Sequence, residues 1–292
     1  MAIVITPGIL LSAILDGLAY GMVIFLIASG LAIIFGLMDI LNFAHATFFM
    51  LGAYITIHFV TYIMKDFILA ILITTIIGFG LGILVEVVLL RPLYGKPASQ
   101  MLLTLGLMLL LLQVVTLFWP AGLVFPIHSY IFVGTIDLIG TRIYVYRLVI
   151  ILIGFGIMLL LDLFLTKTTF GAKIRAGTEN RELAQVFGIN IKLIFTFAFA
   201  LGTAMAFFGG AIASPWLNAT VEIGTNFTLL SFVVVVIGGM KSHRGTFFSS
   251  ILIGIIHQLS AYFLPAITLV IDLLIMIVVL LIKPEGIFGS KE

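Results

Sequence analysis

The stretch "GILLSAILDGLAYGMVIFLIASGLAIIFG", from Gly8 to Gly36, decides the fold. It contains one charged residue, Asp16, and it is longer than the about 20 apolar residues that an α-helix needs to cross the hydrocarbon core of a bilayer. A helix on the surface of a soluble protein would keep a polar face towards water, and this stretch has none. We therefore predict a membrane-spanning helix here.

The rest of the chain has the same character. Of its 292 residues 63% are hydrophobic and 9% are charged, and the mean hydropathy is +1.36. Soluble domains have about 45–50% apolar and about 25% charged residues, so lipid must solvate much of this surface. We predict an all-α polytopic membrane protein with eight to nine transmembrane helices, forming a single domain over residues 1–292. The candidate spans are Gly8–Gly36, Thr47–Met64, Phe67–Leu90, Ser99–Phe118, Arg147–Thr166, Leu193–Ala213, Asn226–Met240, Phe247–Leu264 and Pro265–Ile282.

Several classes of function are excluded by what the sequence lacks. The net charge of +2 is too small to indicate nucleic-acid binding, and the absence of cysteine rules out disulfides, thiolate metal sites and cysteine nucleophiles. A P-loop requires Gly and Lys at fixed spacing before Ser or Thr, yet the only Gly-Lys pair, Gly95-Lys96, precedes Pro97. We therefore predict no catalytic residue, no metal ligand and no cofactor bound by this chain.

Basic residues indicate the orientation. They cluster at Arg91 to Lys96, Lys167 to Lys192, Lys241 to Arg244 and Lys283 to Lys291, and a nine-span arrangement puts all four clusters on one side. Because basic loops stay in the cytoplasm, we expect an outer N-terminus and a cytoplasmic C-terminus. Lys65, Arg142 and Arg147 are the exceptions.

Two loops have patterns of their own. The outer loop, Pro120–Tyr146, alternates β-branched and polar residues, which is typical either of a short hairpin with its turn near Asp137–Gly140 or of a loop without a special role. The inner loop, Thr166–Lys192, predicts a short helix N-capped by Thr178 and stopped by Gly188. Its apolar face is expected either to lie on the membrane surface or to dock in a groove of another protein. That face consists of Leu183, Val186 and Phe187.

A break between the first two spans is the preferred candidate for the solute path. Asn42 and His45 interrupt the apolar run in "DILNFAHA", and a broken helix at membrane depth is tolerated only where it is buried in protein or lines water. The alternative is a tight cytoplasmic turn with these two residues as caps. Phe43 lies between them. Thr104, Gly106 and Gln113 could contribute small or polar residues to the lining of the path.

Six ionisable residues fall inside predicted spans, where charge is costly. Glu86 and Asp162 each precede a basic residue by five positions, so pairing near the cytoplasmic surface is expected for both. Asp16 and Asp272 are the better candidates for facing the interior of the bundle, and His58 and His257 are expected to be structural.

Three stretches carry a resemblance to a known family. They are "NFAHATFFMLGAY" (Asn42–Tyr54), "LLRPLYGKPASQMLLTLGLMLLLLQ" (Leu89–Gln113), and the inner loop with its Gly-Ala-x-x-Arg-Ala motif from Gly171 to Ala176. The chain resembles the branched-chain amino acid permeases of ABC transporters, most of all the first of the two paralogous permeases. It departs from the family pattern at Ala46 and Thr47, and at Lys241, His243 and Arg244.

The resemblance implies a mechanism and partners. Such a permease pairs with a homologous second permease, two ATP-binding subunits dock on its cytoplasmic side, and an extracytoplasmic solute-binding protein delivers the ligand. ATP would be used by those partner subunits, and the site would be the cytoplasmic membrane of a prokaryote. By resemblance, a coupling loop at about residues 167–192 would contact the ATP-binding subunits through Gly171, Arg175, Ala176, Glu179, Asn180, Ala184 and Gly188.

Two other functions stay open at this stage, and a third has no residues to support it. Permeases of the same family for amides or urea are the nearest alternative. An ion-coupled secondary transporter would depend on a membrane carboxylate such as Asp16 or Asp272. An intramembrane enzyme would need a convergent set of Ser and His, paired Asp or metal ligands, and no such spacing is present.

Overall fold

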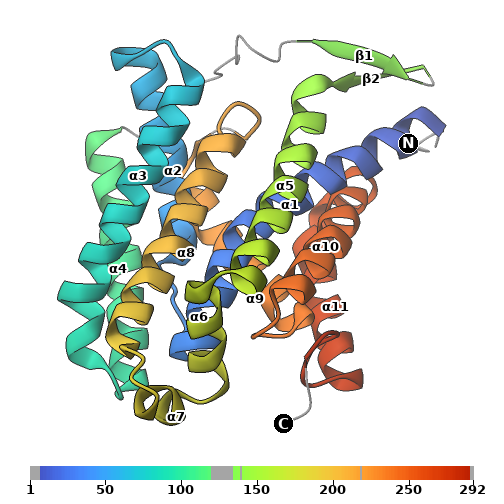
Figure 1. The fold of residues 1–292 in the computed structure, drawn as a ribbon. Coiled ribbons are helices and arrows are strands. Elements are labelled where there is room, and N and C mark those ends of the chain that lie inside the picture. The colour runs from blue at the N-terminus through green and yellow to red at the C-terminus, as the bar shows by residue number, and fades with distance from the viewer. Residues whose placement is uncertain (1–6, 120–133, 139, 218, 290–292) are drawn as a thin grey trace.

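The computed structural model describes residues 7–119, 134–138, 140–217 and 219–289. Within them, helices dominate and only one small sheet occurs (Figure 1). The α-helices are α1 (Pro7–Met38), α2 (His45–His58), α3 (Phe67–Val85), α4 (Pro97–Phe118), α5 (Val145–Lys167), α6 (Thr169–Glu179), α7 (Arg181–Val186), α8 (Ile191–Ala213), α9 (Val221–Gly238), α10 (His243–Phe263) and α11 (Thr268–Ile282). Short turns extend some of them: the π-helical η1 (Phe59–Ile63) and η2 (Glu86–Leu90), and the 3₁₀ turns η3 (Arg91–Leu93) and η4 (Pro265–Ile267).

The prediction of a polytopic helical protein is confirmed. Nine helices of the described residues are long and apolar enough to cross a membrane. Pro265 separates α10 from the last span, so it begins a new crossing and does not kink one broken element. Some helices begin earlier than predicted. The helix α9 begins at Val221 and not at Asn226, and α10 begins at His243 and not at Phe247.

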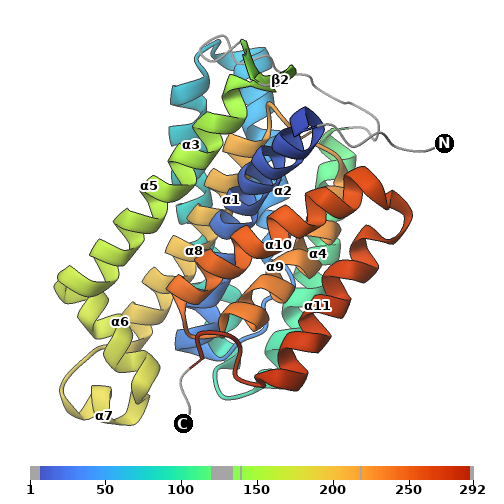
Figure 2. The same cartoon turned by 90° about the vertical axis from the view of Figure 1, so that its right-hand side faces the viewer.

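The helix α1 is the centre of the bundle. Its most apolar window is 94% buried, compared with 17% for α4 and 11% for α11, which lie at the periphery (Figure 2). Glycines let neighbours come close: a Cβ on Gly21 would lie 2.5 Å from the Ser250 carbonyl oxygen of α10, and one on Gly30 would lie 2.5 Å from the Gly202 carbonyl oxygen of α8. Close backbone approach of this kind is how membrane helices pack without a hydrophobic driving force.

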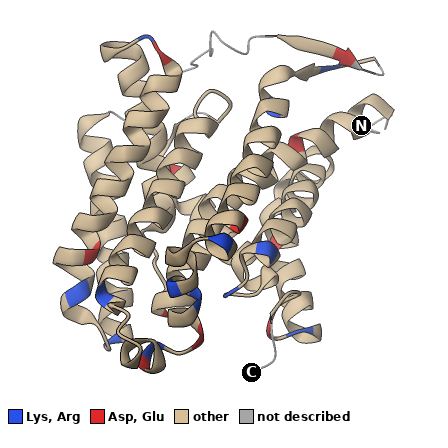
Figure 3. Ribbon diagram, viewed as in Figure 1, with Lys and Arg blue, Asp and Glu red and all other residues tan. Residues whose placement is uncertain are grey.

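The two ends of the bundle differ in charge (Figure 3). One end carries α6, α7 and the last described residues, and we refer to it as the basic end. The other carries strands β1 (Thr135–Leu138) and β2 (Thr141–Tyr144), and we refer to it as the hairpin end (Figure 1). Figure 3 shows most of the Lys and Arg positions at the basic end. The basic residues on or next to the helix ends that lie there are Arg91, Lys96, Lys167, Lys173, Arg175, Arg181, Lys192, Lys241, Arg244 and Lys283.

The hairpin predicted in the outer loop is present. The two strands pair antiparallel, with Leu138 opposite Thr141, and Gly140 has the positive φ of +71° that a tight turn requires. Residues 120–133 and 139 of the predicted loop lie outside the described residues.

The inner loop differs from its prediction. It forms two helices, α6 and α7, where one was expected. Thr178 is not an N-cap, because it lies inside α6 and its hydroxyl donates to the Ile174 carbonyl. Asn180 caps α7 instead, since its Oδ1 accepts a hydrogen bond from the Leu183 backbone N–H at 3.0 Å. Gly188 ends the helical region with a φ of +78°, as predicted.

Candidate translocation and docking sites

The segment from Ile40 to Ala44 runs without helical structure inside the bundle. Its depth follows from His45, the first residue of α2, whose Nε2 lies 3.0 Å from the Ile27 carbonyl oxygen of α1. Ile27 precedes Met38, the end of α1, by 11 residues, which at 1.5 Å per residue is about 16 Å along the helix. By the same measure α1 is about 48 Å long, so the His45 side chain reaches it about a third of the way from its Met38 end. The chain therefore runs back into the bundle before α2 begins. We call residues 39–45 the re-entrant segment.

Thr104 of α4 holds the backbone of this segment. Its Oγ1 accepts a hydrogen bond from the Phe43 N–H at 3.4 Å and lies 3.3 Å from the Leu41 carbonyl oxygen, to which its hydroxyl can donate. Irregular backbone at membrane depth needs such partners, because lipid offers none. Thr104 is almost fully buried, and its one hydroxyl proton has two acceptors within reach, the Leu41 oxygen and the Met101 oxygen of its own helix at 3.0 Å. Its acceptor contact with the Phe43 N–H links α4 to the re-entrant segment.

Two buried polar atoms of the segment have no partner among the described residues: Nδ2 of Asn42 and Nδ1 of His45. Oδ1 of Asn42 accepts from the Ala44 N–H at 3.1 Å, so only the amide nitrogen is left over. His45 must carry its proton on Nε2, since a carbonyl oxygen only accepts. An unpaired polar atom in such a place is costly unless a water or a solute group reaches it in part of the working cycle.

Gln113, also predicted for the path, lies elsewhere. It belongs to α4 but is exposed on the outer surface of the chain, as is Gly106, about two turns away. Phe43 is half-buried and contacts Phe232 of α9, with ring centroids 5.7 Å apart. The structure thus brings together Asn42, Phe43, His45 and Thr104, and it leaves Gln113 apart from them.

Sequence reasoning missed the polar face of α9. Glu222, Thr225 and Asn226 are exposed on its first two turns, although the helix lies within a membrane span. Farther along the same helix, Leu229 is exposed and Phe232 reaches Phe43. The spacing of these residues, every three or four positions, was a signal in the sequence that could have found this face.

The predicted docking residues lie at the basic end. Arg175, Glu179 and Asn180 are exposed on α6 and at the start of α7, whereas Ala184 is buried. Gly171 is buried as well, and it packs closely on α5: a Cβ there would lie 2.3 Å from the Phe164 carbonyl oxygen. Gly171 and Ala184 therefore fix the loop to the bundle, and Arg175, Glu179 and Asn180 remain available to a partner. Ala176 is half-buried and Gly188 is exposed.

The apolar face of α7 does not pack on this chain. Leu183, Val186 and Phe187 are 55%, 81% and 82% exposed. These are large apolar side chains on a helix outside the nine spans. An exposed apolar cluster of this kind marks either a membrane surface contact or a protein contact, as the sequence predicted.

Buried charges at the basic end are paired. Glu86 is fully buried and accepts hydrogen bonds from the Arg91 guanidinium, 3.1 Å away, and from the Tyr94 hydroxyl. Arg91 also donates to the Thr196 hydroxyl of α8 at 2.7 Å. Burial, followed by the hydrogen bond to Glu86, raises the pKa of Tyr94. The pairing of Glu86 with Arg91 is confirmed.

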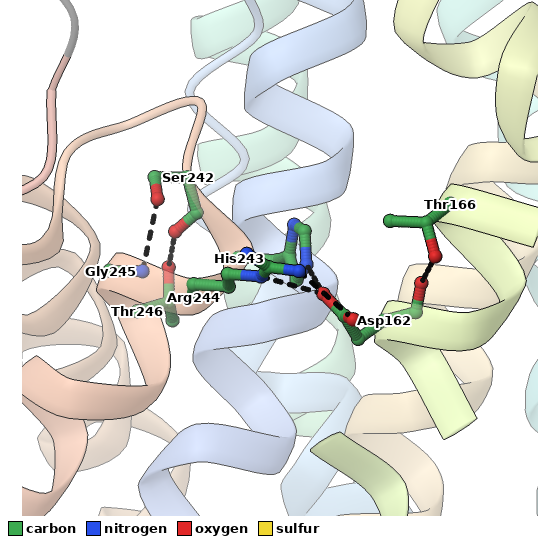
Figure 4. A network of polar contacts seen from close by, with 7 residues as sticks. All are labelled: Asp162, Thr166, Ser242, His243, Arg244, Gly245 and Thr246. Carbon is green, nitrogen blue, oxygen red and sulfur yellow. Dashed lines mark hydrogen bonds and ion pairs between the residues drawn. The ribbon is translucent and has the colours of Figure 1, made fainter. Parts of the chain in front are cut away.

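Asp162 does not pair with Lys167, its expected neighbour. Its carboxylate instead receives two hydrogen bonds from Arg244, at 2.8 and 3.1 Å, and lies 2.9 Å from Nε2 of His243 (Figure 4). This cluster ties the end of α5 to the start of α10. His243 and Arg244, two of the three residues that make this turn more positive than the family pattern, therefore have a structural partner.

The two carboxylates expected in the interior are also paired. Asp16 accepts hydrogen bonds from Arg147 of α5 and from the Tyr262 hydroxyl of α10, which lies 2.9 Å away. Asp272 lies 2.7 Å from Nδ1 of His257. Arg147 and Tyr262 therefore give Asp16 structural partners from two helices. Among the described residues, no group of three His, Cys, Asp or Glu side chains is placed to hold a metal ion.

Nine apolar spans in the described part of the chain, around a polar, non-helical segment inside the bundle, define an α-helical membrane transport protein. The sequence model of a family described as "Branched-chain amino acid transport system / permease component" matches residues 13–280. The chain belongs to this family. It is thus the permease component of a transport system and not an enzyme, as the sequence predicted, and its family implies ATP-binding and solute-binding partners.

Individual relatives agree with this assignment. The chain is 26% identical to the high-affinity branched-chain amino acid transport system permease protein LivH of Salmonella typhimurium, over 97% of this chain and 96% of the relative. It is 26% identical to BraD of Pseudomonas aeruginosa, a permease protein of the same description, over 97% and 96%. It is 29% identical to a probable branched-chain amino acid transport permease protein of Methanocaldococcus jannaschii, over 94% and 92%. No solved structure matches the chain significantly.

Proposed function

We propose that this chain carries branched-chain or other neutral amino acids across the cytoplasmic membrane of a prokaryote, as one permease of an ATP-driven importer. The re-entrant segment is the observation that carries this proposal. It puts a helix break with two unpartnered polar atoms, on Asn42 and His45, inside the bundle, and transporters bind their solutes at broken helices of this kind. ATP would be bound and hydrolysed by partner subunits only.

The substrate class rests on the relatives and on the pairing of charge. The relatives are named for branched-chain amino acid transport. Between Ile40 and Ala44 the re-entrant segment offers polar atoms but no ionisable side chain to a solute, and Asp39 is paired with Arg181. A solute without net charge suits such a site. Amides and urea also lack charge and are the alternative substrates.

The distribution of basic residues supports an orientation. Ten of the basic residues described belong to the basic end, and three belong to the hairpin end: Lys65 after η1, Arg142 in β2 and Arg147 in the first turn of α5. By the positive-inside rule the basic end faces the cytoplasm. The C-terminus would then be cytoplasmic, and the hairpin would face the solute-binding protein outside.

A second, homologous permease would complete the path. Gln113 and the polar face of α9 are exposed within membrane spans, where lipid cannot satisfy their hydrogen bonds. The two helices contact each other. A second permease packed against α4 and α9 would cover these polar residues and enclose a path leading to Phe43. Asn42, Phe43, His45, Thr104 and Gln113 remain the proposed path residues.

The ATP-binding subunits would dock on α6 and α7. Leu183, Val186 and Phe187 would enter a groove of one subunit, and the exposed Arg175 and Glu179 would contact its rim. Replacing Arg175 and Glu179 together by Ala should weaken association of the ATP-binding subunits or separate ATP hydrolysis from uptake. Unchanged association and unchanged coupling in that variant would place the contact elsewhere.

Uptake into proteoliposomes tests the function itself. The vesicles would contain this chain with its second permease and the ATP-binding subunits, and the solute-binding protein would be added outside. We expect ATP-dependent uptake of radiolabelled leucine that exceeds the uptake of acetamide or urea. Higher uptake of acetamide or urea would establish the alternative substrates. Uptake that needs no ATP and is abolished by a protonophore and by Asp16→Asn or Asp272→Asn would establish an ion-coupled transporter.

A further inference from the structure

The proposed docking helix α7 has a direct contact with the re-entrant segment. Arg181, the first residue of α7, forms an ion pair with Asp39, the residue at which that segment begins. The two residues are 142 positions apart in the sequence. No other ion pair that joins α7 to a different element is recorded among the described residues. The guanidinium carbon of Arg181 also lies 5.5 Å from the ring centroid of Phe195 in α8.

Asp39 is the turning point of the chain. Its φ of +50° makes it the only residue other than glycine with a positive φ in the described part of the structure. Its N–H still donates to the Phe35 carbonyl oxygen at 2.8 Å, so α1 ends there and the direction of the chain then changes. Aspartate is one of the few residues that adopt this left-handed conformation readily. The following residue, Ile40, is already buried.

The loop that carries Arg181 is held against the same end of α1 at a second point. A Cβ on Gly177 of α6 would lie 2.9 Å from Cδ1 of Leu37, so the two helices touch just before Asp39. The α6–α7 loop therefore contacts the end of α1 at two points, by packing of Gly177 on Leu37 and by the ion pair of Arg181 with Asp39. A displacement of α7 would act on Asp39 at the point where the backbone turns into the bundle.

We propose that the Arg181–Asp39 ion pair is a positioning contact that transmits movement of α7 to the re-entrant segment, and thereby couples ATP hydrolysis by the docked subunits to the opening of the solute path. The proposal rests on the proposed function. Neither residue touches the solute. The ion pair is partly exposed, with side chains 36% and 57% accessible, so it contributes little to folding stability and its loss should leave the fold intact.

The remaining contacts of the re-entrant segment make the transmission possible. Leu41 and Phe43 are held by Thr104 of α4, and His45 is held by α1. The segment is therefore fixed at its far end and attached to α7 at its near end. Because interfaces of packed helices have discrete arrangements, a shift at Asp39 would move the Asn42–Phe43 region between positions.

A double-mutant cycle in the complete transporter tests the proposal. The variants are Arg181→Gln, Asp39→Asn and both together, since Asn also tolerates the left-handed conformation. Leucine uptake and phosphate release would be measured in the same proteoliposomes. We expect uptake per ATP hydrolysed to fall at least threefold in each single variant and no further in the double variant. The control is Lys96→Gln, which removes an exposed positive charge at the same end, outside the coupling loop, and should change neither value.

A second readout separates transmission from a merely structural role. The chain contains no cysteine, so Leu41→Cys introduces a single thiol into the half-buried part of the segment. We expect its rate of modification by a membrane-impermeant maleimide to change when ATP and vanadate trap the ATP-binding subunits, and this change to disappear in Arg181→Gln. An equal change with and without Arg181, an unchanged uptake ratio in the single variants, or losses that multiply in the double variant would overturn the proposal. Absence of uptake by the wild-type complex would instead overturn the proposed function.

Discussion

The crossing of α1 and α10 gives a prediction whose size can be worked out. Gly21 and Gly254 face each other there: a Cβ on Gly254 would lie 2.4 Å from the Cα of Gly21, and a Cβ on Gly21 would lie 2.5 Å from the Ser250 carbonyl oxygen. Both distances are about 1 Å shorter than carbon and oxygen atoms tolerate, since non-bonded carbon atoms are best about 3.5–4.0 Å apart. Gly21→Ala or Gly254→Ala therefore has to push the two helix backbones apart.

Two opposing terms set the magnitude. Overpacking a well-packed core costs about 1–3 kcal/mol. Replacing Gly by Ala inside a helix returns about 0.5–1 kcal/mol through helix propensity. Because the added Cβ meets backbone atoms, which cannot rotate away, the upper part of the overpacking range applies. The net expectation for either substitution is then a loss of about 1–2 kcal/mol, which lowers the ratio of folded to unfolded protein about 5- to 30-fold.

Gly80→Ala is the matched control. Gly80 lies inside α3, but a Cβ added there meets no atom within 4 Å, so only the gain in propensity applies. Thermal unfolding in detergent micelles, followed by tryptophan fluorescence, measures both variants. Trp216 is a suitable reporter because its ring lies 6.2 Å from that of Tyr20, the neighbour of Gly21. Gly21→Ala unfolding at the same temperature as Gly80→Ala, or above it, would refute the close-packing argument.

Three further predictions concern the polar contacts at the basic end, and the same unfolding assay checks each. Arg91→Ala leaves the buried Glu86 without its ion pair, so we expect a loss near the lower limit of the about 3–5 kcal/mol typical of broken buried pairs; an unchanged unfolding temperature would contradict it. Tyr94→Phe removes one hydrogen bond to Glu86 and keeps the ring, and should cost about 1–2 kcal/mol, less than Arg91→Ala. Asp162→Asn loosens a partly exposed cluster and should cost about 1 kcal/mol or less, and a Lys167→Gln control should cost nothing, because Lys167 is not the partner of Asp162.

Hydropathy and charge made most of the architecture predictable. Apolar runs longer than a bilayer fix the spans whatever their neighbours are, and Asn42 and His45 stand out because they interrupt such a run. Their depth could not be predicted. It depends on the contact between His45 and Ile27, and a tight turn at the membrane surface would have had the same sequence signature.

The two expected carboxylate pairs show where local spacing is insufficient. On an α-helix, residues five apart point about 140° away from each other, so Asp162 and Lys167 cannot meet. Glu86 and Arg91 have the same spacing but do meet, because the chain between them forms the π-helical turn η2. In a π-helix the hydrogen bond runs from residue i to i+5, which brings this pair onto one face. Nothing in the apolar sequence from Val87 to Leu90 distinguishes a π turn from an α turn.

The helix content of the inner loop was also underestimated from local sequence alone, since α6 was not predicted. "TFGAKIRAGTE" contains two glycines, which disfavour a helix, yet it forms α6. Those glycines serve tertiary packing: Gly171 allows contact with α5, and Gly177 allows contact with Leu37 of α1. The residues that weaken the helix locally are thus the residues that fix it to the bundle. The same glycine contacts hold the loop where Arg181 lies beside Asp39. The glycines of α6 are therefore the reason that the loop contacts the re-entrant segment.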